Sequence, residues 1–279
     1  MNVKGFLKTS TVNLLDLFGY QFFQNALLGG VVAAIACALV GLFLILKKEA
    51  MLGDGLSHTA FGGIALGLLL GVNPLLTALG VSVLAVFGIS YMRRKGIAPS
   101  DSAIAVMLAL GFSIGLIVIS VSGGFNVELF SYLFGSILTI DQVDLLSVSL
   151  LGLFVLLFIG FFRRELLSMV FDEEDSRIMG IPTKRLSIAF DLLVAVTIVL
   201  SIKVIGTILV VALLVLPGLS ALKLNFSFRK TLIASIGFSV LSTILGIMFS
   251  AVFDIATAGL IVFLLVLFFL LSMVYRKLA

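Results

Sequence analysis

The chain is a succession of long apolar runs separated by short polar segments that carry most of its charged residues. About 20 apolar residues span a bilayer core as a helix, and the runs are continuous rather than alternating as in barrel strands. They predict membrane-spanning helices over 20–46, 51–72, 75–92, 101–121, 144–162, 187–202, 204–222, 231–250 and 255–275. We therefore expect an all-α integral membrane protein, a polytopic bundle of eight or nine helices that forms one domain over residues 1–279. Residues 1–19 predict an interfacial helix, and residues 124–140 a short, partly embedded helix.

The number of spans depends on residues 187–222, an almost unbroken apolar stretch. A single helix of this length would be about 54 Å long and would overshoot the membrane. We favour a tight turn at Lys203 and Gly206, which gives two helices and nine spans in all. The alternative is a kink in one long helix, which gives eight.

Charge sets the expected orientation. Of the 18 lysine and arginine residues, 15 lie at one set of alternating span ends, and the exceptions are Lys4, Lys8 and Lys203. This bias predicts a cytoplasmic C-terminus and, with nine spans, an outside N-terminus. Only 11% of the residues are charged, whereas a soluble domain carries roughly 25%. The net charge of +4 therefore marks topology, and we expect no nucleic-acid partner.

The main candidates for chemistry are Asp54 and the only histidine, His58. Residues four apart share one face of a helix, and ionisable groups at membrane depth are costly and usually functional. A carboxylate oxygen and an imidazole nitrogen suit Mn²⁺, Zn²⁺ or Fe²⁺. His58 lies about 15 Å along the helix axis from Lys48, half of a roughly 30 Å core. The alternative is structural: Asp54 caps a helix start after Gly53, and His58 hydrogen-bonds a neighbouring helix.

A cytoplasmic connection over 165–185 contains four consecutive acids, residues 172–175. Carboxylates suit a helix N-terminus, and Gly180 and Pro182 would stop the helix. With Phe171, Ile178, Met179 and Ile181 as its apolar component, this segment predicts either a docking helix for a cytoplasmic partner or a solvated loop.

Other chemistry is limited. No Gly-Lys dipeptide occurs, so the chain has no phosphate-binding P-loop, and any ATP hydrolysis belongs to another subunit. Cys37 is the only cysteine, and one His with one Cys cannot form a zinc-hydrolase ligand set, so we expect no enzyme. Asp101 predicts a helix cap, Asp191 a position near the inner interface, and Asp254 either a cap or a cation-attracting outer residue.

The glycines form two groups. Close helix packing is predicted by Gly53, Gly55, Gly62, Gly63 and Gly67. Gly206, Pro217 and Gly218 predict either a break in the helix of the seventh span or close helix packing alone.

Four segments together resemble the membrane permeases of bacterial and archaeal ABC importers for zinc, manganese or iron. They are residues 51–58 (MLGDGLSH) with 62–66 (GGIAL), 133–138 (LFGSIL), 171–181, and 204–214 (VIGTILVVALL) with Pro217. Their order and spacing agree from about residue 20 to 275. The chain departs from the family pattern at Phe61, where many members have proline before the glycine, and at 218–220, where Ala-Ala-Thr is common.

The resemblance implies a type II ABC importer-like permease in a bacterial or archaeal plasma membrane. It implies a homodimer, bound to cytoplasmic ABC ATPases and supplied by an extracellular metal-binding protein. Asp54 and His58 match the residues proposed to hold the transported ion, and no cofactor is bound permanently. The segment that matches the coupling element to the ATPase contains Asp172, Glu173, Glu174, Arg177, Met179 and Gly180.

The alternative function is an ion-coupled secondary metal transporter without an ATPase. Such a protein is expected to contain internal repeats, and the chain has no convincing duplication. We therefore expect the permease of an ATP-driven importer for zinc or manganese, with iron as a further candidate.

Overall fold

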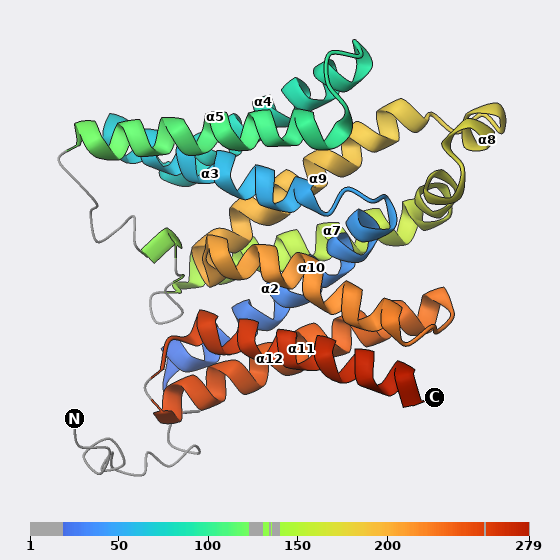
Figure 1. Cartoon of the computed structure of the whole chain (residues 1–279). Coiled ribbons are helices and arrows are strands. Elements are labelled where there is room, and N and C mark those ends of the chain that lie inside the picture. Colours follow the sequence, from blue (N-terminus) through green and yellow to red (C-terminus); the bar gives the residue numbers. More distant parts are fainter. Residues whose placement is uncertain (1–18, 123–130, 134, 136–139, 254, 279) are drawn as a thin grey trace.

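The computed structural model describes residues 19–122, 131–133, 135, 140–253 and 255–278, and the regular elements in this part of the chain are helices (Figure 1). They are α2 (Gln21–Leu46), α3 (Met51–Leu70), α4 (Pro74–Arg94), α5 (Ser100–Val121), α7 (Gln142–Phe171), α8 (Glu173–Ile178), α9 (Thr183–Ile205), α10 (Thr207–Lys223), α11 (Phe228–Phe253) and α12 (Thr257–Leu278). The all-α fold is confirmed, and each predicted span coincides with a helix. The predicted interfacial helix and most of 124–140 lie outside the described residues.

Seven of the described helices are long and apolar enough to cross a membrane: α2, α4, α5, α7, α9, α11 and α12. The expected eight or nine spans are therefore too many by this criterion. The two long helices that do not meet it are α3 and α10. In α3, Asp54, His58 and several glycines dilute the apolar residues, and α10 has only 17 residues.

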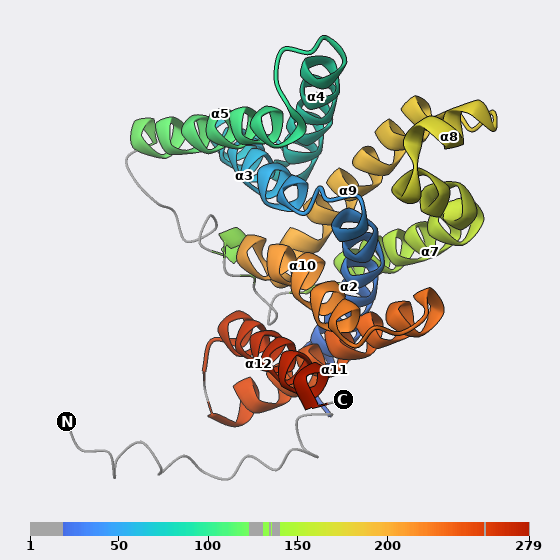
Figure 2. The same cartoon turned by 45° about the vertical axis from the view of Figure 1, so that its right-hand side comes forward.

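The break between α9 and α10 falls at Gly206, whose backbone has φ 80° and ψ 158°. Glycine adopts positive φ without the steric cost of a Cβ. The chain reverses direction here, as both views show (Figures 1 and 2). The predicted turn is confirmed, and the single kinked helix is wrong. Pro217 lies inside α10 and does not end it, so the expected break is at Gly206 alone.

The connections lie at two opposite ends of the molecule (Figure 1). The α2–α3, α4–α5 and α10–α11 connections lie at one end together with α8, here called the α8 end. The α3–α4 connection and Gly206 lie at the other, here called the Gly206 end. Arg93, Arg94 and Lys184 are at the α8 end, in agreement with the segregation of basic residues in the sequence.

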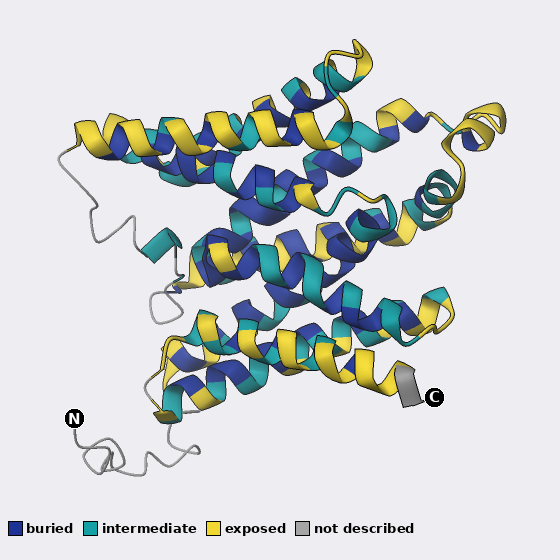
Figure 3. Cartoon of the chain, viewed as in Figure 1, coloured by how far each residue is buried: buried dark blue, intermediate teal, exposed yellow. Residues whose placement is uncertain are grey.

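The helices form two groups with α9 between them (Figures 1 and 2). One group contains α3, α4 and α5, and the other contains α2, α7, α10, α11 and α12. In the most apolar window of each helix, 72% of residues are buried in α2 and 67% in α9, against 22% in α12. Figure 3 shows the exposed positions on the outer faces of α5 and α12. The core therefore runs along α2 and α9.

Glycines bring α3 close to both other helices of its group. A Cβ on Gly63 would lie 2.6 Å from the Cα of Ala78 in α4. A Cβ on Gly111 of α5 would lie 2.5 Å from the Cα of Thr59. Real Cβ atoms do not approach backbone this closely, so both contacts require glycine. The sequence predicted this for Gly63 but did not single out Gly111.

This packing predicts that Gly63→Ala destabilises the protein by about 1–3 kcal/mol, the usual cost of overpacking. Gly80→Ala is the matched control in α4, because no atom lies within 4 Å of a Cβ there. Glycine costs a helix up to about 1 kcal/mol relative to alanine, so the control is expected to be neutral or stabilising. Thermal unfolding of the detergent-solubilised protein measures both. Equal melting temperatures for the two variants would contradict the contact.

Candidate functional site

One narrow stripe of α3 escapes burial. From Met51 to Ala65 every residue is buried except Met51, Asp54 and His58. Spacings of three and four residues place all three on one face of the helix. Sequence reasoning missed Met51, although its position three residues before Asp54 was a usable signal.

The two ionisable side chains on this stripe meet. His58 Nε2 lies 3.5 Å from Asp54 Oδ1, and the side chains are 38% and 36% exposed. The imidazole and the Phe112 ring of α5 make a T-shaped contact, with centroids 5.2 Å apart and planes at 80°. The ring contact and the carboxylate thus orient the imidazole, and both groups keep exposed surface for a third partner.

The structural alternative for this pair does not hold. Helix α3 begins at Met51, and its N-cap is Ala50, so Asp54 does not cap it. In the described part of the chain, His58 has no hydrogen bond to another helix. The neighbouring hydroxyl of Ser57 donates to the Gly53 carbonyl oxygen at 2.7 Å and is directed back to its own helix. Neither structural role is therefore found for the pair among the described residues.

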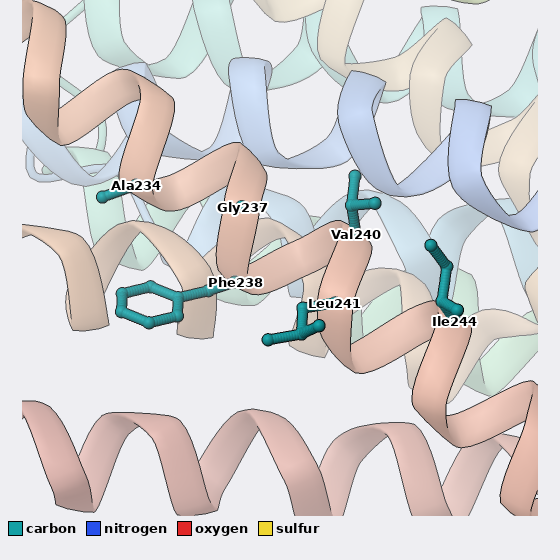
Figure 4. Close-up of a pocket in the computed structure, with 6 residues that line it drawn as sticks. All are labelled: Ala234, Gly237, Phe238, Val240, Leu241 and Ile244. Atoms are coloured by element: carbon teal, nitrogen blue, oxygen red, sulfur yellow. The ribbon is translucent and has the colours of Figure 1, made fainter.

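One copy of the chain supplies few ligands. Among the described residues no group of three or more His, Cys, Asp or Glu side chains is placed to hold a metal ion. The surface pocket on α11 offers no alternative, because its lining is apolar: Ala234, Gly237, Phe238, Val240, Leu241 and Ile244 (Figure 4).

Two of the motifs identified in the sequence meet at the Gly206 end. Gly135 has φ 76°, and a Cβ there would lie 2.6 Å from the carbonyl carbon of Ile205. Thr207 Oγ1 donates to the carbonyl oxygen of Leu133 at 3.1 Å. Leu133 and Gly135 therefore pack onto the α9–α10 turn. Residues 134 and 136–138 of that motif lie outside the described residues.

The acidic segment forms the short helix α8, as predicted. The Asp172 carboxylate caps it by accepting from the backbone N–H groups of Glu174 at 2.8 Å and Asp175 at 3.0 Å. The buried Ser176 hydroxyl bonds that of Ser168 at 2.8 Å, which ties α8 to the end of α7. Gly180, at φ 86°, turns the chain toward α9.

The outer surface of this segment is apolar as well as acidic. Phe171, Ile178 and Met179 are 87%, 83% and 75% exposed, and Glu173, Glu174 and Arg177 are exposed beside them. The α7 helix has 30 residues, or about 45 Å, so it is longer than a bilayer core is thick. The structure thus presents α8 beyond the helix bundle.

A cluster of four charges was only partly foreseen. Asp191, expected near an interface, lies in α9 beside Lys47, Glu49 and Arg93 at the α8 end. We call these four residues the charge cluster. In the sequence, Lys47 and Arg93 counted only among the 15 basic residues that mark topology, and Glu49 was not singled out, since the contacts of the cluster join segments distant in the sequence.

Two further acidic residues near span ends, Asp141 and Asp144, have structural roles, whereas the cap expected of Asp101 is not found. Asp101 lies in the first turn of α5, but the N-cap is Pro99, so the predicted cap is wrong. Asp141 caps α7, and the Asp144 backbone N–H donated to its carboxylate lowers the pKa of Asp141. Asp144 forms an ion pair with Lys203. Lys203 is one of the three basic residues that the charge bias left at the other ends of the spans. Asp254 lies outside the described residues.

Comparisons with known proteins agree with this architecture. The family model described as "ABC 3 transport family" matches residues 19–276. A manganese transport system membrane protein, MntC of Halalkalibacterium halodurans, is 32% identical over 88% of this chain and 85% of its own length. A chelated iron transport system membrane protein, YfeD of Yersinia pestis, is 30% identical over 93% of this chain and 87% of its own.

A solved structure is similar throughout. PsaBC from Streptococcus pneumoniae, in complex with Fab, contains a chain that superimposes with a TM-score of 0.85 at 31% identity. The match covers 96% of this chain and 99% of that one.

The cap of α8 is directly testable. Asp172→Ala removes both hydrogen bonds to the first turn and is expected to destabilise α8 by about 0.5–2 kcal/mol. Trypsin should then cleave after Arg177 faster than in the unaltered protein. Asp175→Ala, which changes an acid of the same helix that caps nothing, is the control. Equal cleavage rates for both variants would contradict the capping role.

Proposed function

The chain belongs to the ABC 3 transport family, and from this premise we propose that it is the permease through which an ATP-driven importer passes a divalent transition-metal ion. It is a multi-pass membrane protein and a transport subunit, not an enzyme. ATP hydrolysis takes place on a partner ATPase, in keeping with the family.

The observation that carries this proposal is the half-exposed Asp54–His58 pair on the unburied stripe of α3. A carboxylate and an imidazole do not face lipid, because ionisable side chains at membrane depth turn toward a protein interior or a water-filled path. The pair thus lines the route of the ion. Asp54 supplies an anionic oxygen, and His58 supplies a nitrogen.

The cargo we propose is Mn²⁺ or Fe²⁺, with Zn²⁺ as a weaker candidate. The oxygen and nitrogen donors suit all three ions. Relatives named for manganese and for chelated iron transport favour the first two. Two ligands leave the remaining coordination positions to water or other groups. Such weak ligation suits a site that must release its ion.

We further propose that two copies of the chain form the pathway. In a single copy the side chains of Asp54 and His58 are partly exposed, and lipid is an unfavourable neighbour for that exposed polar surface. A second copy supplies that cover and places a polar route between the two permeases. An extracellular metal-binding protein delivers the ion at the Gly206 end.

The α8 end faces the cytoplasm in this proposal, and α8 docks the ATPase. An amphipathic helix presented beyond the bundle is a common way to fit a groove on a partner. Ile178 and Met179 supply the apolar contact, while Glu173, Glu174 and Arg177 supply the charged rim. Asp172 and Gly180 serve differently, since they shape the helix and its exit.

The metal assignment predicts that Asp54→Ala and His58→Ala each reduce uptake by at least about tenfold, because even outer-shell partners of a metal contribute 10–100-fold to its binding. Uptake of radioactive manganese into proteoliposomes that contain the permease with its ATPase measures the loss. Asp101→Ala, an exposed acid in the first turn of α5, is the matched control and should transport normally. Normal uptake by both site variants would refute the assignment.

The same assay separates the importer from a secondary transporter. Uptake should require ATP on the side of the ATPase and persist without an ion gradient. A gradient that drives uptake in the absence of ATP would contradict the importer.

The docking role predicts that the double change Glu173→Lys with Glu174→Lys uncouples ATP hydrolysis from uptake. It reverses the charge of the docking surface and spares the Asp172 cap, so α8 still forms. The measurements are co-purification with the ATPase and metal taken up per ATP hydrolysed. Unchanged values for both would show that α8 does not dock the ATPase.

A further inference from the structure

The charge cluster brings together three separate parts of the chain at the α8 end. Lys47 ends α2, Glu49 lies in the α2–α3 linker, Arg93 lies in the last turn of α4, and Asp191 lies in α9. Lys47 Nζ lies 3.0 Å from Glu49 Oε2 and 3.4 Å from Asp191 Oδ1. Arg93 Nη1 lies 3.0 Å from Glu49 Oε1 and 3.7 Å from Asp191 Oδ2. Two cations thus balance two anions.

The cluster is buried, with side-chain exposures between 4% and 19%. Buried ion pairs are weak evidence for stability, since desolvation offsets much of their attraction, and their best-attested role is in register and switching. The cluster also crosses a boundary. It joins α4, a member of the α3–α4–α5 group, to α9 and to the end of α2. Ion pairs between two helix groups are contacts that change when the groups move relative to each other.

The two cations are held very differently. Lys47 is fixed to α9: it donates to Ser187 Oγ at 3.3 Å and lies 5.0 Å from the centre of the Phe190 ring. Arg93 uses one nitrogen, Nη1, for both of its carboxylates. Its Nε and Nη2 are buried and have no hydrogen-bond partner in the described part of the chain. Glu49 Oε2 also lacks a hydrogen bond, but Arg93 has two such buried atoms. Since buried polar atoms are normally paired, the cluster is least satisfied at Arg93.

The α4 helix is tied at both ends by different means. Near the Gly206 end it packs backbone to backbone on Gly63 and Gly67 of α3. At the α8 end its last turn is held by the ion pairs of Arg93. Loss of those pairs would let the α8 end of α4 swing about the glycine contacts. The Glu49 partner lies five residues before Asp54, so the motion would take place beside the start of the metal-binding helix.

We propose that Arg93 is a positioning residue for transport: its ion pairs with Glu49 and Asp191 hold the α8 end of α4 against α9, and they separate and re-form as the permease changes state. This inference rests on the proposed function, because the cycle it describes is that of ATP-driven import. Arg93 does not touch the ion. It sets whether the inner end of the pathway is closed.

The test measures the distance between the ends of α4 and α9. Spin labels are placed at Lys95→Cys and Lys184→Cys, both exposed, with the buried Cys37 replaced by serine. The full permease, with labels on only one of its two copies, is bound to its ATPase in lipid nanodiscs and examined by pulsed electron paramagnetic resonance with and without ATP. The unaltered cluster is expected to give two distances whose proportions change with ATP. Arg93→Gln should lose most of the shorter distance under both conditions and lower the metal taken up per ATP.

Two further variants make the result specific. Arg93→Lys should resemble the unaltered cluster more closely than Arg93→Gln does, because one cationic nitrogen makes all the present contacts. Lys203→Gln, which removes the ion pair with Asp144 at the Gly206 end, should leave the distances unchanged.

The outcomes separate this inference from the proposed function. A single distance that ATP does not change, in the protein with its cluster intact, would overturn the inference even if Arg93→Gln does not fold. Distances in Arg93→Gln equal to those of the intact cluster would overturn it too. The proposed function fails independently, if the complex with its cluster intact takes up no divalent metal ion with ATP.

Discussion

The close approach of α3 to α4 and α5 is the constraint on which the rest of the structure depends. It exists because glycines stand where the backbones touch, as at Gly63 and Gly111. Any rotation of α3 about its axis would bring side-chain carbons against those backbones, so the helix has one allowed orientation. Asp54 and His58 lie on the only face of its first half that packing leaves open. Glycines, which have no reactive side chain, thus determine the direction in which Asp54 and His58 point.

The Asp54–His58 contact differs from the other ion pairs of the structure in how its charge is balanced. Apart from this contact, the ion pairs among the described residues form two sets, Asp144 with Lys203 and the charge cluster. Each of those sets balances anion against cation. The carboxylate on α3 has only an imidazole, which carries charge only when protonated. A divalent cation is the partner that would complete this site, whereas the other sets need none.

Sequence analysis predicted the helices, the turn at Gly206 and α8 with its acidic start, because each depends on local pattern. It placed Asp54 and His58 on one face for the same reason. It did not find the charge cluster, since Glu49, Arg93 and Asp191 are brought together only by the packing of α4 on α9. The cap predicted at Asp101 was wrong, because α5 begins at Ser100 and its N-cap is Pro99, two residues before Asp101. What the sequence left open was therefore which distant segments touch.

A transport site and a structural metal site place opposite demands on a protein. A structural site gains stability from a full set of rigid ligands, as in four-coordinate zinc. A permease that bound its cargo so tightly would stop, because the ion has to leave on the other side. Two side chains on a rigid helix answer this: α3 fixes their direction, and the incomplete ligand set keeps the affinity low. In the proposed cycle, release is controlled by movement of the neighbouring helices, and the Arg93 contacts of the charge cluster are those we propose to separate and re-form.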